Sequence, residues 1–166
     1  MTILHAPPAA GSRQPSASSS QDISQRARIR FRQPVSTAGF IDAAWWPHTH
    51  DLTVEIPPLM DVLWTAGRDI NRVTYYLHAW DPAPRRLQID GRSVRLGGFT
   101  VGDPNTITLS DAWGRERVDI LVIPPDTEPA RAQRILELAG ESDGGYRADE
   151  ILERAAETPP ARPARR

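Results

Sequence analysis

Apolar and polar residues alternate strictly in the segment Arg26–Arg32. Ala27, Ile29 and Phe31 fall on one side of an extended chain, and four arginines fall on the other. Alternation of this kind predicts a β-strand with one buried face, and Pro34 ends it.

A helical period follows the loop 39–46. The apolar positions recur at i, i+4, i+7, i+8 and i+11, which is the spacing of one helix face. They are Leu52, Ile56, Leu59, Met60 and Leu63. Proline is tolerated in a first turn but breaks a helix interior. Because Pro57 and Pro58 lie inside the pattern, either the helix begins near Pro57 or an earlier turn from Asp51 is kinked there.

Short strand patterns occupy the middle of the chain. Residues 72–80 are β-branched and aromatic, which predicts a strand. Residues 86–96 predict a hairpin around the turn Asp90-Gly91, and residues 106–122 predict another around a turn at 111–114. After two prolines, an apolar stripe predicts a second helix that is capped by Asp126 or Thr127 and ends before Gly140. That stripe consists of Ala132, Ile135, Leu136 and Ala139.

These elements predict one α+β domain over residues 25–139. Its expected form has two layers, a mostly antiparallel sheet of five to six strands with two helices on one face. Residues 1–24 are rich in Pro, Ala, Ser and Gln, so a disordered tail is expected there. Residues 140–166 are expected to form a flexible tail, in which a short helix within 147–157 docks weakly or not at all.

Composition narrows the class of protein without identifying it. The 166-residue chain has no Cys, which excludes disulfide scaffolds, zinc fingers and thiolate enzymes. No apolar run approaches the roughly 18 residues of a membrane span, and no signal peptide is recognised, so we expect a soluble cytoplasmic protein. All 20 basic side chains are Arg. Between Gln25 and Ala139 the arginines and acidic residues are equal in number, whereas nucleic-acid-binding domains carry a positive excess.

Two loops combine aromatic and charged side chains. Trp45 and Trp46 are adjacent, so either one faces out as a recognition surface or both are core, between the sheet and the first helix. The segment Trp80–Arg86 places an aromatic ring, a carboxylate and two guanidinium groups at a strand end. It can clamp an anion, or Asp81 can pair with an arginine and rigidify the turn. The candidate ligand-binding residues are Trp45, Trp46, Trp80, Asp81, Arg85 and Arg86.

His48 and His50 have a spacing that suits a metal chelate, with Asp51 or Asp42 as a further ligand. The favoured alternative is that they are solvated loop histidines at a helix start, with Asp51 as its N-cap. We therefore expect no metal site and no cofactor.

Two other functions have weaker support in the sequence. A small hydrolase would use Asp42, His78 or Asp81 for proton transfer, but no nucleophile motif accompanies them. Nucleic-acid binding would use Arg26, Arg28, Arg30 and Arg32, whose spacing of about 7 Å approaches that of phosphates. The alternative is a solvated strand face, neutralised by Asp119 or Asp90.

Several motifs together indicate a family. They are the segments Gly39–Pro47, Asp51-Leu52 with Glu55–Pro57, Tyr76 with Ala79–Leu87, Arg95–Phe99 and Val122–Thr127. Over nearly the whole predicted domain, the chain resembles a family of short actinobacterial proteins whose function is unknown. The resemblance implies no activity, cofactor or catalytic residue. In that family the positions of His48 and His50 are more often Arg or Ser, which further disfavours a metal site.

The function expected from the sequence is therefore a non-catalytic binding or regulatory module. Its expected partner is a small anionic ligand or another protein, and neither a membrane nor a nucleic acid is expected. Catalysis is the less favoured reading.

Overall fold

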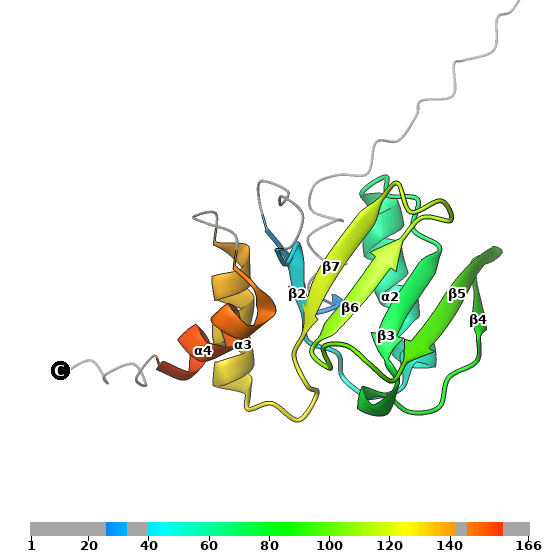
Figure 1. The fold of residues 1–166 in the computed structure, drawn as a ribbon. Coiled ribbons are helices and arrows are strands. Elements are labelled where there is room, and N and C mark those ends of the chain that lie inside the picture. The colour runs from blue at the N-terminus through cyan, green and yellow to red at the C-terminus, as the bar shows by residue number, and fades with distance from the viewer. Residues whose placement is uncertain (1–25, 33–39, 142–145, 158–166) are drawn as a thin grey trace, which may run out of the picture.

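The computed structural model describes residues 26–32, 40–141 and 146–157, and the tail predicted at 1–24 lies outside them. Within this part of the chain the protein is α+β, with a seven-stranded mixed sheet and three α-helices (Figure 1). The elements are β1 (Ile29–Phe31), β2 (Ala43–Trp45), α2 (Leu52–Thr65), β3 (Arg72–Tyr76), the 3-10 turn η1 (Leu77–Ala79), β4 (Arg86–Ile89), β5 (Arg92–Phe99), β6 (Thr106–Ser110), β7 (Arg117–Val122), α3 (Pro129–Gly140) and α4 (Ala148–Glu157).

The strands lie in the order β1-β2-β7-β6-β3-β5-β4. Neighbouring strands are antiparallel, except that β2 runs parallel to β7 and β3 runs parallel to β5. The predicted α+β class is confirmed, but the sheet has seven strands instead of the predicted five to six, and it is mixed because two of its six neighbouring pairs are parallel. The prediction missed β2, which lies in the stretch predicted as a loop. Three residues that are all buried give no apolar-polar alternation, so the strand has no sequence signal.

Helices cover both faces of the sheet, not one face as predicted. Neighbouring residues of β2 belong to two separate cores. Ala43 and Trp45 pack with α2, whereas Ala44 packs with α3 and α4. Figure 1 shows α2 behind the sheet and α3 with α4 beside β2. A strand that is apolar at every position needs cover on both sides, and this requirement explains the second helical layer.

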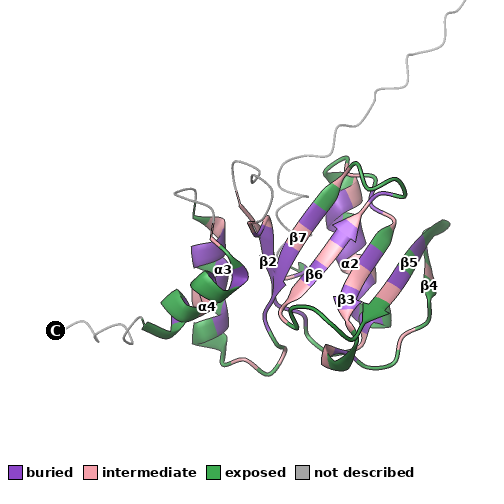
Figure 2. Ribbon diagram, viewed as in Figure 1, coloured by how far each residue is buried: buried purple, intermediate pink, exposed green. Residues whose placement is uncertain are grey.

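The second layer is narrow. Its core includes residues of β2 and β7, and α3 also contacts β1. On the face of the sheet opposite α2, no described helix covers β6, β3, β5 or β4. The side chains of these strands on that face are half-buried or exposed. Figure 2 shows these strands in front of α2. We call this surface the open face. It is formed by Arg72, Thr74 and Tyr76 of β3, Arg86 and Gln88 of β4, Ser93, Arg95, Gly97 and Phe99 of β5, and Thr106, Thr108 and Ser110 of β6.

Helix α2 starts directly after Asp51, the earlier of the two predicted starts. The Asp51 carboxylate accepts a hydrogen bond from Thr53 N at 2.8 Å and so caps the helix. The helix continues through Pro57 and Pro58. These prolines leave the carbonyls four residues earlier without donors. Those carbonyls belong to Thr53 and Val54, which are exposed, so water can satisfy them.

Both predicted hairpins are confirmed. Strands β4 and β5 are joined by Asp90 and Gly91, whose φ angles of 48° and 78° suit a two-residue turn. Strands β6 and β7 form the second hairpin. The strand predicted over 72–80 is shorter, however, because the chain turns through η1 after Tyr76 and brings Trp80 into the core.

The C-terminal helices differ from expectation at two points. The N-cap of α3 is Glu128, which accepts hydrogen bonds from the backbone N–H groups of Ala130 and Arg131, and not Asp126 or Thr127. Pro129 at the first helical position accounts for this start. Helix α4 forms where a short helix was predicted, but it packs on α3 and does not lie apart. It buries Ala148, Ile151 and Ala155 in the second core.

No helix in the described ranges is long and apolar enough to cross a membrane.

Candidate functional site

Trp45 and Trp46 lie in the two cores of the protein. Trp45 is 1% exposed and Trp46 is 8% exposed. Trp45 stacks on Trp80, with ring centroids 5.6 Å apart. The prediction that one of the pair faces out is wrong, and the alternative that both are core is confirmed. Such burial leaves neither side chain accessible to a ligand, so both drop out of the candidate site.

The segment Trp80–Arg86 is divided between two cavities. Trp80 and Asp81 line a cavity of about 360 Å³ together with His50 and His78. Arg85 and Arg86 line a separate cavity of about 410 Å³ on the open face. Asp81 forms no ion pair with an arginine among the described residues, so the alternative of a turn rigidified by such a pair is wrong.

His48 and His50 lie in different surroundings at the start of α2. His48 Nδ1 lies 3.6 Å from the carboxylate of Glu55, and His50 lines the cavity beside Trp80. Among the described residues, no three His, Asp or Glu side chains lie together as metal ligands. Asp51 caps α2, as the favoured alternative predicted.

The cap at Asp51 makes stability depend on pH. Hydrogen bonds from the hydroxyl and backbone N–H of Thr53 lower the pKa of Asp51. A lowered folded-state pKa contributes stability above the unfolded value of about 3.9, and that contribution is lost as the pH falls through the folded value. We expect Asp51→Ser, which keeps a capping oxygen but does not titrate, to weaken the fall in Tm between pH 5 and pH 2. Asp126→Ser, at an exposed carboxylate that caps no helix, is the control, and identical pH curves for Asp51→Ser and wild type would contradict the assignment.

The three candidate proton-transfer residues do not meet. His78 and Asp81 line the same cavity, but no hydrogen bond joins them in the described structure. Asp42 lies between β1 and β7, where its carboxylate accepts a hydrogen bond from Asp119 N at 2.9 Å. General acid-base catalysis requires hydrogen-bond reach, and no described contact brings Asp42 to the other two. The hydrolase reading therefore gains no support.

The arginines of the first strand are used within the fold. Arg28 has a φ of 48°, so the strand begins only at Ile29. The Arg28 guanidinium donates hydrogen bonds to the carbonyls of Trp46 and Pro47 and lies 3.8 Å from the Trp46 ring centroid. Arg30 lies against Gly140 at the end of α3. Arg26 and Arg30 are exposed, whereas Arg28 is held against Trp46, so the prediction that the four arginines form one uniform face is wrong.

A row of arginines crosses the open face instead. Strand register places Arg86 of β4 opposite Arg95 of β5, and Arg95 opposite Arg72 of β3. Adjacent strands are about 4.8 Å apart, so three guanidinium groups project from neighbouring positions. All three side chains are exposed. We call Arg72, Arg86 and Arg95, together with Arg85 beside them, the arginine row.

No acidic residue in the described part of the chain pairs with the arginine row. None of its four members forms an ion pair with another described residue. The next arginine along the same line of strands is Arg117 of β7, beyond Ser110 of β6. In contrast to the row, Arg117 binds Asp119 through contacts of 2.9 to 3.2 Å, and this hydrogen-bonded ion pair raises the pKa of Arg117. The positive charge of the open face is thus concentrated on β3, β5 and β4.

The cavity at the arginine row has a polar and an aromatic side. Thr74 and Gly97 are opposite each other in the register of β3 and β5, and both line the cavity. Phe99 also lines it, and its Cε2 atom lies 3.7 Å from the position that a Cβ on Gly97 would occupy. The Phe99 ring therefore leans back along β5 over the backbone of Gly97.

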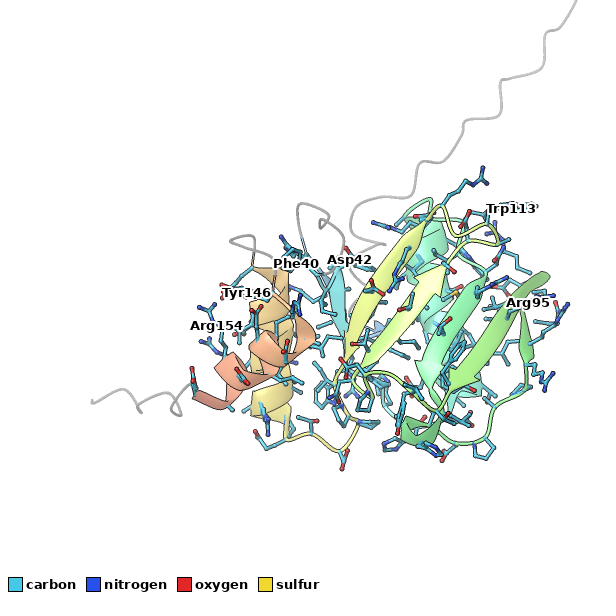
Figure 3. All side chains as sticks on the ribbon, in the orientation of Figure 1. Phe40, Asp42, Arg95, Trp113, Tyr146 and Arg154 are labelled. Atoms are coloured by element: carbon cyan, nitrogen blue, oxygen red, sulfur yellow. The ribbon has the colours of Figure 1, made fainter. Side chains whose placement is uncertain are left out.

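Sequence reasoning found Arg85 and Arg86 but missed Arg72 and Arg95. Arg72 and Arg95 each lie at an outward position of a strand with alternating apolar and polar residues. Such a pattern indicates that the residue faces solvent, but it does not indicate a binding site. Their proximity depends on the parallel pairing of β3 and β5, which no local pattern indicates. Figure 3 shows Arg95 on β5, at the opposite side of the sheet from Asp42 and α4.

The fold and the site define a class of protein: an α+β domain whose mixed sheet is covered by α2 on one face and only partly by α3 and α4 on the other, where a cationic cavity lies. The chain belongs to DUF5994, a family of unknown function whose model matches residues 28–139. This match confirms that the chain resembles a family of unknown function. No curated protein and no solved structure matches the chain.

Proposed function

We propose that the protein is a non-catalytic binding module, which serves a binding or regulatory role by taking a small anionic ligand on the arginine row. The observation that carries this proposal is the in-register set Arg72, Arg95 and Arg86, which has no acidic partner among the described residues. Like charges directly opposite one another destabilise a sheet. An anion bound between these arginines would reduce the repulsion among their guanidinium groups.

The chemistry of the cavity supports binding of an anion. The guanidinium fork matches the geometry of phosphate and carboxylate groups, and the Thr74 hydroxyl adds a neutral hydrogen-bonding group. The cavity volume of about 410 Å³ lies in the range of small-molecule binding sites. The described lining residues include no His, Asp or Glu, so the cavity lacks a general base and suits binding better than catalysis.

The test is calorimetric titration with inorganic tripolyphosphate at low ionic strength. Replacing either of two central arginines, as Arg72→Gln or Arg95→Gln, should weaken binding about 10-fold or more, because a hydrogen bond to a charged group contributes about 1.5–3 kcal/mol. Arg131→Gln is the matched control. It removes the same charge from an exposed position on α3 and should leave the affinity within about twofold.

A second measurement separates binding from folding. Without ligand, Arg95→Gln should unfold at the same temperature as the wild type or higher, because it removes two cross-strand like-charge contacts. Absence of tripolyphosphate binding to the wild type, or an equal loss of affinity in Arg131→Gln, would overturn the proposal.

A further inference from the structure

We infer that the ligand of the open face is a nucleoside polyphosphate, with its phosphate chain on the arginine row and its base against Phe99. This inference rests on the anion-binding function proposed above and adds the chemical class of the ligand. It depends on Phe99, the aromatic side chain that shares the cavity with the four arginines.

Phe99 is exposed in a way that suits a stacking surface. The side chain is 56% exposed although it ends a strand whose inward positions, Val94 and Leu96, are buried in the α2 core. Its register partner on β3 is Tyr76, which is half-buried and makes an edge contact with the ring of His78 at 5.5 Å. Because every nucleobase has a flat π-face, an exposed ring beside cationic side chains is the recurring way in which proteins hold a base.

The spacing along β5 separates the two halves of such a ligand. Arg95 and Phe99 are four residues apart on the same strand, which corresponds to about 13 Å between their backbones. Gly97 lies between them on the same face, and the Phe99 ring reaches back over it, which shortens the gap. The long arginine side chain shortens the gap from one end. The cavity therefore offers a phosphate end and a base end, connected across a glycine.

The charge of the arginine row favours more than one phosphate. A phosphate monoester carries about −1.5 to −2 charges at neutral pH, so four unpaired guanidinium groups exceed what one such group can neutralise. A chain of two or three phosphates matches them better. It can also extend along the row, which crosses three strands over about 10 Å.

The surroundings of the arginine row favour a free nucleotide over a polynucleotide. Beyond β6 the charge is mixed and no longer purely cationic, because the carboxylates of Asp103, Asp119 and Asp149 line the next cavity together with Arg117 and Arg147, and Arg117 is paired with Asp119. The whole chain has a formal charge of −1. A longer strand of nucleic acid would place further phosphates against these carboxylates, whereas a single nucleotide fits within the cationic part.

The experiment compares ATP with inorganic tripolyphosphate, both titrated into the full chain in buffer that contains EDTA. Tripolyphosphate lacks the nucleoside and carries at least as much negative charge, so electrostatic attraction alone would make it bind at least as tightly. We expect ATP to bind about fivefold more tightly or better, because stacking on one aromatic ring contributes about that factor or more. Phe99→Ala should remove this advantage and leave tripolyphosphate binding unchanged, and Phe99→Tyr should preserve it.

Trp113→Ala is the matched control. Trp113 is 80% exposed in the turn between β6 and β7 but does not line the cavity, so its removal should not change the preference for ATP (Figure 3). Equal affinity for the two ligands, or loss of the preference in Trp113→Ala and not in Phe99→Ala, would overturn the inference while leaving the anion-binding proposal intact. Tighter binding of a single-stranded oligoribonucleotide than of ATP would also overturn it. Failure of both ligands to bind would remove the proposed function itself.

Discussion

Replacing Trp45 by alanine is expected to lower the free energy of unfolding by about 3–5 kcal/mol, the usual cost of truncating a fully buried tryptophan. Trp45 is 1% exposed and lies on the short strand β2, in register with Ile29 of β1 and Val122 of β7. Its ring also supports Trp80, which stacks on it. The substitution thus removes a central contact and leaves a second large side chain without its partner. Urea unfolding followed by circular dichroism measures the change.

Trp113→Ala is the control for Trp45→Ala, because it deletes the same side chain from a position that is 80% exposed. We expect it to change stability by no more than about 0.5 kcal/mol, as is usual for surface substitutions. Trp45→Phe, which keeps an aromatic ring, should fall between the two. Equal stability of Trp45→Ala and Trp113→Ala would contradict the placement of Trp45 in the core.

Replacing Glu55 by alanine is expected to lower the free energy of unfolding by about 1.5–3 kcal/mol, because it removes a buried charged acceptor and the two hydrogen bonds that Thr49 donates to it. Glu55 is 4% exposed and accepts hydrogen bonds from Thr49 N at 2.8 Å and from the Thr49 hydroxyl at 3.1 Å. Its charge also acts on Arg28, whose pKa is lowered by burial and held up in part by this carboxylate. Glu55 thus joins α2 to the loop after β2 and to the residue before β1.

Glu55→Gln should lose less stability than Glu55→Ala, because its amide oxygen can still accept from Thr49. Glu137→Ala serves as the control. Glu137 lies 3.8 Å from Arg134 on the surface of α3 with 60% of its side chain exposed, and such pairs contribute about 0–1 kcal/mol. Similar denaturation midpoints for Glu55→Ala and Glu137→Ala would show that the buried contacts of Glu55 are not stabilising.

Elements with a local signal could be predicted from the sequence. The β4–β5 hairpin follows from Asp90-Gly91 between alternating runs, and α2 follows from the spacing of its buried face. Strand β2 could not be predicted, because both of its faces are buried and its partners β1 and β7 are distant in sequence. The docking of α4 was underestimated for a related reason. Its apolar side is small, and a sequence does not show that α3 provides a surface to receive it.

The candidate site shows the same division between local and long-range information. Arg85 and Arg86 stood out because they follow an aromatic ring and two prolines, whereas Arg72 and Arg95 lie in ordinary alternating strands. Only the order of the strands brings the four together. The sequence left open whether Trp45 or Trp46 faces out. Adjacent residues of a strand point to opposite sides, but one of them reaches solvent only when the sheet has one covered face.

The parallel pair β2–β7 also has a consequence for the order in which the protein assembles. The Asp119 backbone N–H donates a hydrogen bond to the Asp42 carboxylate across this pair, and the two residues are 77 positions apart in the sequence. Both hairpins, in contrast, close within a few residues of their turns. Closing a long loop costs more chain entropy than closing a short one, and distant contacts slow folding. We therefore expect the hairpins to form early and β1–β2 to join last. The side of the sheet that anchors α3 would then be the last to acquire its native contacts, and the strands that carry the arginine row would be among the first.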